Sequence, residues 1–243
     1  MEKKKIAAVV LAAGQGKRMG TETAKQYLLL DGKPVLYYAL HAFEKSEVDI
    51  VVLVTGKDEI KYCKEEIVDK FGFKKVQAVV PGGKERYHSV ACGLRALKAQ
   101  RKEIEVVHIH DGARPFVTPA MISKLIAETR EKEACVIGTP VKDTIKIADE
   151  EGYCAQTPPR NKVWAVQTPQ TFAFDLVSGA YEKLLACEDE LLAQGVQITD
   201  DAMVVENMTQ KKVSLVEGEY TNIKLTTPED LIIAESFMKK LKK

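Results

Sequence analysis

The sequence predicts an α/β protein with a doubly wound, mostly parallel, Rossmann-like sheet and a projecting β-hairpin arm. Over the first 140 residues, short apolar β-branched runs alternate with segments whose apolar residues recur at helical spacing. Glycine-containing stretches follow three of these runs, where such sheets bind ligands, at the carboxyl ends of strands. After residue 140 the alternation changes to period two, which predicts the hairpin.

The first part of the chain is expected to alternate strictly between strands and helices. Strands are expected at 6–13, 50–54, 76–80, 106–111 and 134–139, and helices at 35–47, 58–70, from the glycines after 81 to about 101, and 119–133. Asp58 is expected to cap the second of these helices. Thr118 is expected to cap the fourth, because Pro119 suits the first helical position.

The second part of the chain departs from this alternation. The pattern predicts a hairpin of segments 140–147 and 153–160, joined by a turn at 150–152. A lone hairpin is only marginally stable in water. A second subunit is therefore a candidate to cover it, and 140–163 is taken as a dimerisation arm of a single domain, 1–243. The remaining elements are expected to be a helix at 172–194, a short helix capped by Thr199 and ending at 207, strands at 213–216 and 222–226, and a last helix opening at Thr227–Pro228.

Composition excludes several classes of protein. The 243 residues are 45% hydrophobic and carry a formal net charge of +1. The net charge therefore gives no reason to expect binding to nucleic acid or to an anionic membrane. No apolar run approaches the length of a transmembrane helix. The five cysteines are scattered and odd in number, without a Cys-x-x-Cys pair, so a disulfide framework or zinc knuckle is not expected and a cytoplasmic location fits best.

The stretch 9–27 is the first with chemical meaning. A buried strand leads into a loop in which Gly14 and Gly16 allow a sharp turn and a close approach of backbone N–H groups to a ligand. Arg18 and Lys25 then supply positive charge. This combination suits a polyphosphate, whereas the glycines alone would be equally consistent with an ordinary strand-to-helix turn.

Two better-known phosphate loops do not match this stretch. A dinucleotide fingerprint requires a third glycine, but Met19 occupies that position, and no acidic residue closes the next strand about 20 residues on. A Walker A loop requires Ser or Thr after Gly-Lys, but Arg18 follows Gly16 and Lys17.

Two further stretches follow expected strands. In 82–90, glycines precede Arg86 and Ser89. This pattern is consistent with a second site for an anion or a base at a helix N-terminus, and also with an exposed glycine turn. In 106–115, Asp111 ends a strand, where it can hold Mg²⁺ against a triphosphate, and Arg114 can reach a phosphate through both guanidinium nitrogens.

His108 and His110 lie two residues apart on the same expected strand and therefore share a face. A transition-metal site would need a third ligand, which the sequence does not offer, so packing in the strand is the favoured interpretation.

The motifs together resemble the 2-C-methyl-D-erythritol 4-phosphate cytidylyltransferases, nucleotidyltransferases of isoprenoid precursor synthesis. The resemblance covers nearly the whole chain. Its motifs are Leu-Ala-Ala-Gly-x-Gly-x-Arg-Met at 11–19, Lys-Gln-Tyr at 25–27, Gly-Gly-x-x-Arg-x-x-Ser at 82–89, His-Asp-x-Ala-Arg-Pro at 110–115, Gln-Thr-Pro-Gln-x-Phe at 167–172, and Asn-Ile-Lys at 222–224 before Thr-Pro-Glu-Asp-Leu at 227–231. Lys84 departs from the pattern, since an acidic residue is often seen there, and receives no role.

The resemblance implies the nucleotide-diphospho-sugar transferase fold and the joining of CTP to methylerythritol phosphate with release of pyrophosphate. It implies catalytic roles for Arg18, Lys25, Arg160 and Lys224, and nucleotide contacts from Ala12, Ala13, Gly14, Gly16, Lys25, Gly82, Arg86, Ser89 and Asp111. Contacts to the acceptor substrate are implied for Asp111, Gly112, Arg114, Thr144, Arg160, Thr199, Asp200 and Lys224. Asp111 is the implied ligand of Mg²⁺ or another divalent cation, and Thr144 and Arg160 are implied to act on the partner's site in a homodimer.

Two other functions remain open on the sequence. A ribitol-5-phosphate cytidylyltransferase has the same nucleotide loops, although the spacing from Arg160 through Trp164 to the Gln-Thr-Pro-Gln motif favours the methylerythritol enzymes. A non-catalytic nucleotide-binding protein of the same fold is disfavoured because Arg18, Lys25 and Asp111 are all present.

Overall fold

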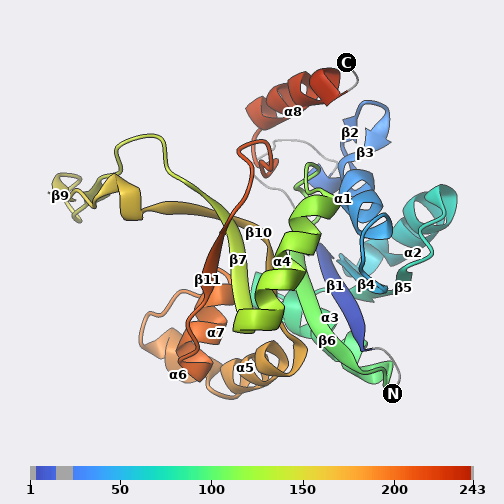
Figure 1. Ribbon diagram of the computed structural model, residues 1–243, viewed down its shortest axis with the longest axis horizontal. Coiled ribbons are helices and arrows are strands. Elements are labelled where there is room, and N and C mark those ends of the chain that lie inside the picture. The colour runs from blue at the N-terminus through green and yellow to red at the C-terminus, as the bar shows by residue number, and fades with distance from the viewer. Residues whose placement is uncertain (1–3, 15–23, 242–243) are drawn as a thin grey trace.

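The computed structural model describes residues 4–14 and 24–241, and a seven-stranded sheet forms its centre (Figure 1). The strands lie in the order β11-β7-β10-β6-β1-β4-β5. Their bounds are Lys5–Ala12 (β1), Ile50–Thr55 (β4), Val76–Pro81 (β5), Ile104–Asp111 (β6), Ala134–Pro140 (β7), Trp164–Ala173 (β10) and Ser214–Glu217 (β11). The short strands β2 (Leu29–Leu30) and β3 (Lys33–Pro34) form a separate hairpin.

The sheet is mostly parallel, as the sequence predicts. β1 pairs in parallel with β4 and β6, β4 with β5, and β7 with β11, whereas β10 runs antiparallel to both of its neighbours. From β1 the chain builds outward through β4 and β5, then returns to place β6 on the other side of β1. The carboxyl ends of β1 and β6 therefore meet at a topological switch point, where open α/β sheets bind their ligands.

Helices cover both faces of the sheet. Their bounds are Val35–Glu44 (α1), Ile60–Tyr62 (α2), Arg86–Ala99 (α3), Pro119–Lys132 (α4), Phe174–Ala186 (α5), Glu188–Ala193 (α6), Asp201–Thr209 (α7) and Pro228–Leu241 (α8). Shorter helical segments are Lys25–Tyr27 (η2), Lys57–Glu59 (η3), Cys63–Asp69 (η4) and Arg160–Lys162 (η5).

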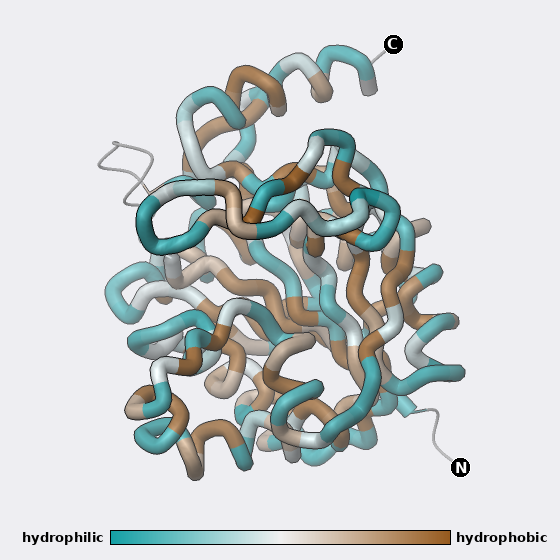
Figure 2. The backbone as a smooth tube through the Cα atoms, turned by 90° about the vertical axis from the view of Figure 1, so that its left-hand side faces the viewer, coloured by the Kyte–Doolittle hydropathy of each residue, from teal (hydrophilic) through white to brown (hydrophobic). Residues whose placement is uncertain are grey.

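Two apolar cores result, one on each face of the sheet. Side chains of a strand point alternately to its two faces, so Ile6 and Val10 enter the core beneath α1 and α4, and Ala7 and Val9 enter the core beneath α3 and α5. Figure 2 shows hydrophobic segments along the central strands and hydrophilic ones in the peripheral loops. A third, smaller cluster joins α8 to the β2–β3 hairpin.

Two expected elements differ from the structure. Residues 222–226, expected as a strand, belong to no sheet; the Leu225 N–H donates to Ala113 O, and side chains of neighbouring segments bond to Asn222 and Thr226. The helix expected at 172–194 begins at Phe174 and is interrupted at Cys187. The reason is that β10 extends to Ala173 and inserts between β6 and β7, a long-range pairing that local periodicity does not contain.

Two expected helix caps are also wrong. Asp58 lies inside η3 and does not cap it; instead, the Glu59 carboxylate accepts the Gly56 N–H at 3.0 Å. Asp200 rather than Thr199 caps α7, because its side chain accepts the Met203 N–H. The expected cap of α4 is confirmed: Thr118 accepts the Met121 N–H at 3.2 Å, and Pro119 is the first helical residue.

The segment after β7 forms the expected hairpin, with β8 (Ile147–Ala148) antiparallel to β9 (Cys154–Gln156). It projects away from the sheet (Figure 1), and its residues are largely exposed, including Tyr153 at 70%. Its base is fastened to the body: the Tyr220 hydroxyl donates to Pro140 O, and the Lys142 ammonium lies 3.8 Å from the centre of the Tyr220 ring. Within residues 4–14 and 24–241, no helix is long and apolar enough to cross a membrane.

Candidate active site

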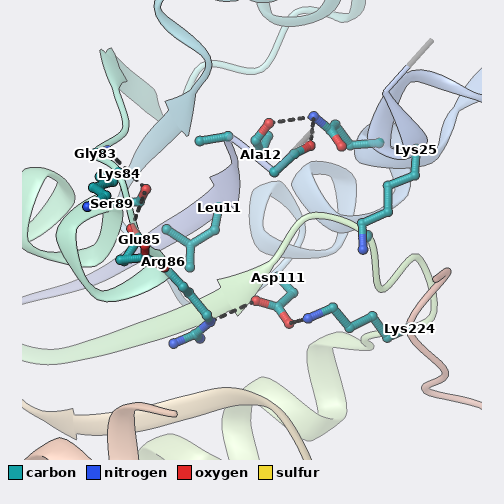
Figure 3. Close-up of a pocket in the computed structure, with 14 residues that line it drawn as sticks. Leu11, Ala12, Lys25, Gly83, Lys84, Glu85, Arg86, Ser89, Asp111 and Lys224 are labelled. Atoms are coloured by element: carbon teal, nitrogen blue, oxygen red, sulfur yellow. Dashed lines mark hydrogen bonds and ion pairs between the residues drawn. The ribbon is translucent and has the colours of Figure 1, made fainter. Parts of the chain in front are cut away.

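A pocket of about 570 Å³ opens at the switch point of the sheet (Figure 3). Its wall combines the ends of β1 and β6, the η2 turn, the start of α3 and the segment after β11. The lining residues are Leu11, Ala12, Ala13, Gly14, Lys25, Gln26, Gly83, Lys84, Glu85, Arg86, Ser89, Asp111, Ala113 and Lys224. The three stretches that the sequence singled out therefore converge here.

Gln26 holds the end of β1 against the η2 turn. Its buried side-chain amide donates to Ala12 O at 2.6 Å and to Gly14 O at 3.2 Å. The next residue anchors the same turn on the other side, since the Tyr27 hydroxyl contacts Thr55 Oγ1 at 2.9 Å and donates to Glu59 Oε2 at 3.0 Å. These contacts place Lys25 at the pocket wall, with its ammonium directed into the pocket (Figure 3).

The glycines after β5 allow a close approach of three loops. A Cβ on Gly82 would lie 2.6 Å from the Ala13 Cβ and 2.7 Å from the Ser89 hydroxyl, so a larger residue would push the β1 loop and α3 apart. The Gly83 N–H donates to Ser89 Oγ at 3.1 Å. Ser89 thus fixes this loop, and the pocket wall is formed by Gly83 rather than by Gly82.

Asp111 lies between two cations at the floor of the pocket (Figure 3). Its Oδ2 is 2.7 Å from Lys224 Nζ, and its Oδ1 accepts from Arg86 Nε at 3.4 Å. Burial disfavours the charged carboxylate, but the charges of Arg86 and Lys224 outweigh burial and hold the pKa of Asp111 well below its usual range. Asp111 is therefore an anion at neutral pH.

A second pocket of about 260 Å³ adjoins the first and shares Arg86, Asp111 and Lys224 with it. Its other lining residues come from β10, from the loop after β6 and from the loop before α7: Arg114, Val166, Gln167, Thr168, Gln170, Thr199 and Asp200. The row Arg86–Asp111–Lys224 therefore forms a common wall between the two pockets.

The backbone at Asp111 is held by a chain of buried hydrogen bonds. The Asp111 N–H donates to Thr168 Oγ1 at 3.1 Å, which lies 3.0 Å from His110 Nδ1, and His110 Nε2 is 3.2 Å from the Arg114 carbonyl. A carbonyl can only accept, so Nε2 carries the proton and Nδ1 accepts from the Thr168 hydroxyl. Burial lowers the pKa of His110 to about 4 and that of His108 to about 3, so both rings are neutral and structural.

The histidines therefore serve packing, as the sequence favours. Within the described parts of the chain, no three His, Cys, Asp or Glu side chains cluster as a metal site.

Sequence reasoning missed the group that holds Arg86. Asp201, fully buried at the start of α7, accepts from Arg86 Nη1 at 2.8 Å and Nη2 at 2.7 Å, and from the Tyr181 hydroxyl at 2.5 Å. The Gln170 carbonyl oxygen accepts the N–H groups of Asp201 and Ala202. These partners of Asp201 lie 20 to 115 residues away from it, so no local pattern could have shown the contacts.

Most of the described residues expected at the site are brought together. Lining one pocket or both are Ala12, Ala13, Gly14, Lys25, Arg86, Ser89, Asp111, Arg114, Thr199, Asp200 and Lys224. Gly112 does not line either pocket; it is buried, and its N–H donates to Leu11 O at 2.8 Å. Thr144 and Arg160 lie on the arm and line neither pocket of their own chain. Gly16 and Arg18 lie outside the described residues.

Lys224 reaches the site from a segment that α8 secures. The Asp230 carboxylate accepts from the Thr226 N–H and hydroxyl at 2.7 Å and from the Thr227 N–H at 2.9 Å. Ile223 and Leu225 pack in the cluster that includes α8. The chain on both sides of Lys224 is thus held down, while Lys224 itself faces Asp111.

Known proteins match this chain over almost its full length. The family model described as 2-C-methyl-D-erythritol 4-phosphate cytidylyltransferase matches residues 6–240. Proteins of that name from Lachnoclostridium phytofermentans and Geotalea uraniireducens are 50% and 46% identical, over 97% of this chain and 97% of each of theirs.

Solved structures agree with the sequence matches. The crystal structure of 4-diphosphocytidyl-2C-methyl-D-erythritol synthase from Anaerococcus prevotii is 36% identical, with a TM-score of 0.82 over 97% of this chain and 96% of that chain. The cytidylyltransferase from Thermus thermophilus is 29% identical, with a TM-score of 0.72 over 98% of this chain and all of that one. Their fold is the nucleotide-diphospho-sugar transferase fold expected from the motifs. The chain therefore belongs to the 2-C-methyl-D-erythritol 4-phosphate cytidylyltransferase family.

Proposed function

We propose that this protein transfers the cytidylyl group of CTP to 2-C-methyl-D-erythritol 4-phosphate and releases pyrophosphate, in isoprenoid biosynthesis. The family supports the reaction, and one structural observation carries it: two adjoining pockets share a wall made of Arg86, Asp111 and Lys224. A reaction that joins two anionic substrates needs two binding spaces that meet at a group of cations.

The larger pocket is assigned to CTP and the smaller one to the acceptor. The larger pocket is lined by Ala13 and Gly14 after β1, by Gly83 after β5 and by Lys25 on η2. The smaller pocket is lined by Arg114, Thr199 and Asp200, residue types that suit an alcohol phosphate. Both assignments place the reacting phosphates at the common wall.

The reaction needs positioning and charge stabilisation rather than a general base. An oxygen of the acceptor phosphate, already anionic near neutral pH, attacks the α-phosphorus of CTP; a new P–O bond forms as the bond to the β-phosphate breaks, and the electron pair leaves with pyrophosphate. Lys25 is assigned to the negative charge that builds on the transferred and leaving groups. Lys224 and Arg114 are assigned to the acceptor phosphate.

The residues present fit a divalent cation that arrives with CTP. Mg²⁺ is held in proteins by one or two carboxylates together with substrate phosphates and water. Asp111 offers an ionised carboxylate at the junction of the pockets, and the described residues contain no larger ligand cluster. When bound, Mg²⁺ would neutralise charge on the triphosphate oxygens.

We further propose a homodimer in which the arm of one subunit completes the acceptor pocket of the other. Thr144 and Arg160 line neither pocket of their own chain, yet the family resemblance implies that they contact the acceptor phosphate. The hairpin exposes apolar side chains, with Ile147 at 48% and Tyr153 at 70%, which a second subunit would cover.

The test is pyrophosphate release with CTP and Mg²⁺, comparing methylerythritol 4-phosphate with ribitol 5-phosphate as the acceptor. Release with the first alone is expected. Release with ribitol 5-phosphate alone would leave the assignments of the CTP pocket and the mechanism in place but would contradict the assignment of methylerythritol phosphate as the acceptor. Release with neither, despite CTP binding, would contradict the catalytic assignment. Chelation of Mg²⁺ by excess EDTA should abolish release.

A further inference from the structure

We propose that Asp201 is a positioning residue, which acts through Arg86 to set the geometry of the wall between the two pockets. The proposal rests on the function proposed above, because the wall matters only if both pockets are filled together. Asp201 itself lines neither pocket.

The contact between Asp201 and Arg86 is a buried, two-pronged ion pair. Asp201 is 0% exposed, and each of its oxygens accepts from a different terminal nitrogen of the guanidinium, at 2.8 and 2.7 Å. A pair of parallel N–H···O bonds fixes the plane of the guanidinium as well as its position, which a single bond or a lysine cannot do.

The fixed plane determines how Arg86 meets its other partners. With both Nη atoms turned toward Asp201, Nε faces Asp111 at 3.4 Å (Figure 3). Among residues 4–14 and 24–241, Arg86 makes no further hydrogen bond, which leaves one N–H on each Nη atom for ligands. Arg86 borders both pockets, so these donors lie where the two substrates meet.

Asp201 is itself held from three sides. Its backbone N–H donates to Gln170 Oε1 at 2.9 Å, the Tyr181 hydroxyl donates to its Oδ1, and α7 begins at this residue. Asp201 also balances the charge of Arg86, so that Asp111 is left with Lys224 as its close partner, at 2.7 Å against 3.4 Å for Arg86. Without Asp201, the guanidinium would be drawn toward Asp111.

The test compares Asp201→Asn with Tyr181→Phe. In Asp201→Asn, the side-chain NH2 group faces a donor of Arg86, so one of the two parallel hydrogen bonds between residues 86 and 201 is lost. Tyr181→Phe removes a different hydrogen bond to the same carboxylate and leaves both bonds to Arg86 intact. Both variants lose a buried hydrogen bond, so their melting temperatures serve to match them for stability. We expect Asp201→Asn to lower kcat by about 10- to 100-fold, as small misplacements of reacting groups do, with a smaller change in CTP affinity measured by calorimetry.

Tyr181→Phe is expected to keep kcat within about threefold of wild type. A kcat for Asp201→Asn equal to that of Tyr181→Phe would overturn the proposal, because a merely structural role would affect both alike. If the wild-type protein releases no pyrophosphate, the proposed function has failed instead, so the two failures are distinguishable.

A double-mutant cycle tests whether Asp201 acts through Arg86. Arg86→Lys keeps the positive charge but cannot span both carboxylate oxygens, and it should show the same selective loss of kcat. In the Arg86→Lys background, Asp201→Asn should then cost little more. Additive losses would contradict action through Arg86. If Asp201→Asn does not fold, Arg86→Lys alone still tests the proposal. A kcat near that of the wild type would show that the paired hydrogen bonds between Arg86 and Asp201 are not needed.

Discussion

Lys25 is the residue whose loss should separate chemistry from binding most clearly. Its ammonium points into the larger pocket from a turn that Gln26 and Tyr27 hold in place. Charge on the leaving group develops only in the transition state. We therefore expect Lys25→Ala to lower kcat by about 100-fold or more and to weaken CTP binding far less.

The measurement is steady-state pyrophosphate release beside calorimetric titration of CTP. Lys57→Ala, an exposed lysine outside both pockets, is the control. Equal losses in kcat and in CTP affinity would contradict the assignment of Lys25 to stabilisation of the transition state.

The buried histidines should make the protein less stable in acid. In the unfolded chain each histidine binds a proton at a pH near 6.5, but burial lowers the folded pKa to about 3 for His108 and about 4 for His110. Below pH ~6.5 the unfolded state therefore binds protons that the folded state does not, and the free energy of unfolding falls as the pH falls. Each histidine contributes a slope of up to about 1.4 kcal/mol per pH unit.

The check is urea unfolding between pH 7 and 5. His108→Gln should show a shallower fall than wild type, by the slope of one histidine. His41→Gln replaces an exposed ring whose pKa is lowered by a smaller shift, so it should flatten the slope less than His108→Gln does. An unchanged slope in His108→Gln would show that His108 takes up a proton in the folded state.

At the residue scale, sequence motifs located the pocket wall but not what supports it. Lys25, Arg86 and Asp111 follow glycine-containing loops or end a strand, so their clustering follows from parallel topology, whereas Lys224 is brought in by packing against α8. No role was predicted for Asp201, because its partner Arg86 is 115 residues away. Local pattern carries no information on such pairs.

At the element scale, the parallel strands were predictable and the antiparallel one was not. The apolar run of β1 and the alternation with helices identify β4, β5, β6 and β7. β10 contains Gln167, Thr168 and Gln170, polar residues that do not form the apolar run of a buried strand, yet all three are buried in the sheet. Their polar groups are satisfied by long-range partners, among them Asn222 and Asp200.

Segment 222–226 shows the converse error. Its apolar alternation resembles a strand, but Ile223 and Leu225 are buried against α8 rather than in a ladder. Lys224 depends on this packing for its position, so the last helix contributes to the site without touching it.

We expect Asp230→Asn to weaken acceptor binding through Lys224. The Asp230 carboxylate accepts from the Thr226 and Thr227 N–H groups, and loss of such a cap costs about 1 kcal/mol of stability. The KM for methylerythritol phosphate should rise more than the KM for CTP, because Lys224 is assigned to the acceptor. Glu235→Gln, exposed on the same helix, is the control. Equal changes in both KM values would contradict the claim that α8 supports acceptor binding through Lys224.

At the scale of the whole molecule, the two apolar cores and the switch point make one subunit's pockets, but the arm lies outside both. Among the described residues, its two short strands are held at the base by Tyr220 and by a bond from Val141 N to Val163 O. Arg160, expected at the acceptor phosphate, instead donates to Lys142 O within the arm. The proposed role of Arg160 at the acceptor phosphate therefore depends on the proposed homodimer.

Mixing two inactive variants tests this arrangement. Arg160→Ala removes the arm's contribution, and Lys25→Ala removes that of the pocket, so each homodimer should be nearly inactive. In a heterodimer, the pocket of the Arg160→Ala chain receives the intact arm of the Lys25→Ala chain, and one complete site results. Random exchange makes half of the dimers heterodimers with one good site of two, so activity should recover to roughly a quarter of wild type.

The recovery should appear only after the subunits have exchanged, for example by joint refolding, and size-exclusion chromatography should show dimers throughout. If the arm served its own subunit, both defects would stay in separate sites and every mixed dimer would lack a complete one. Absence of recovery in a mixture that contains heterodimers would thus contradict exchange of the arm, whatever the two single variants show.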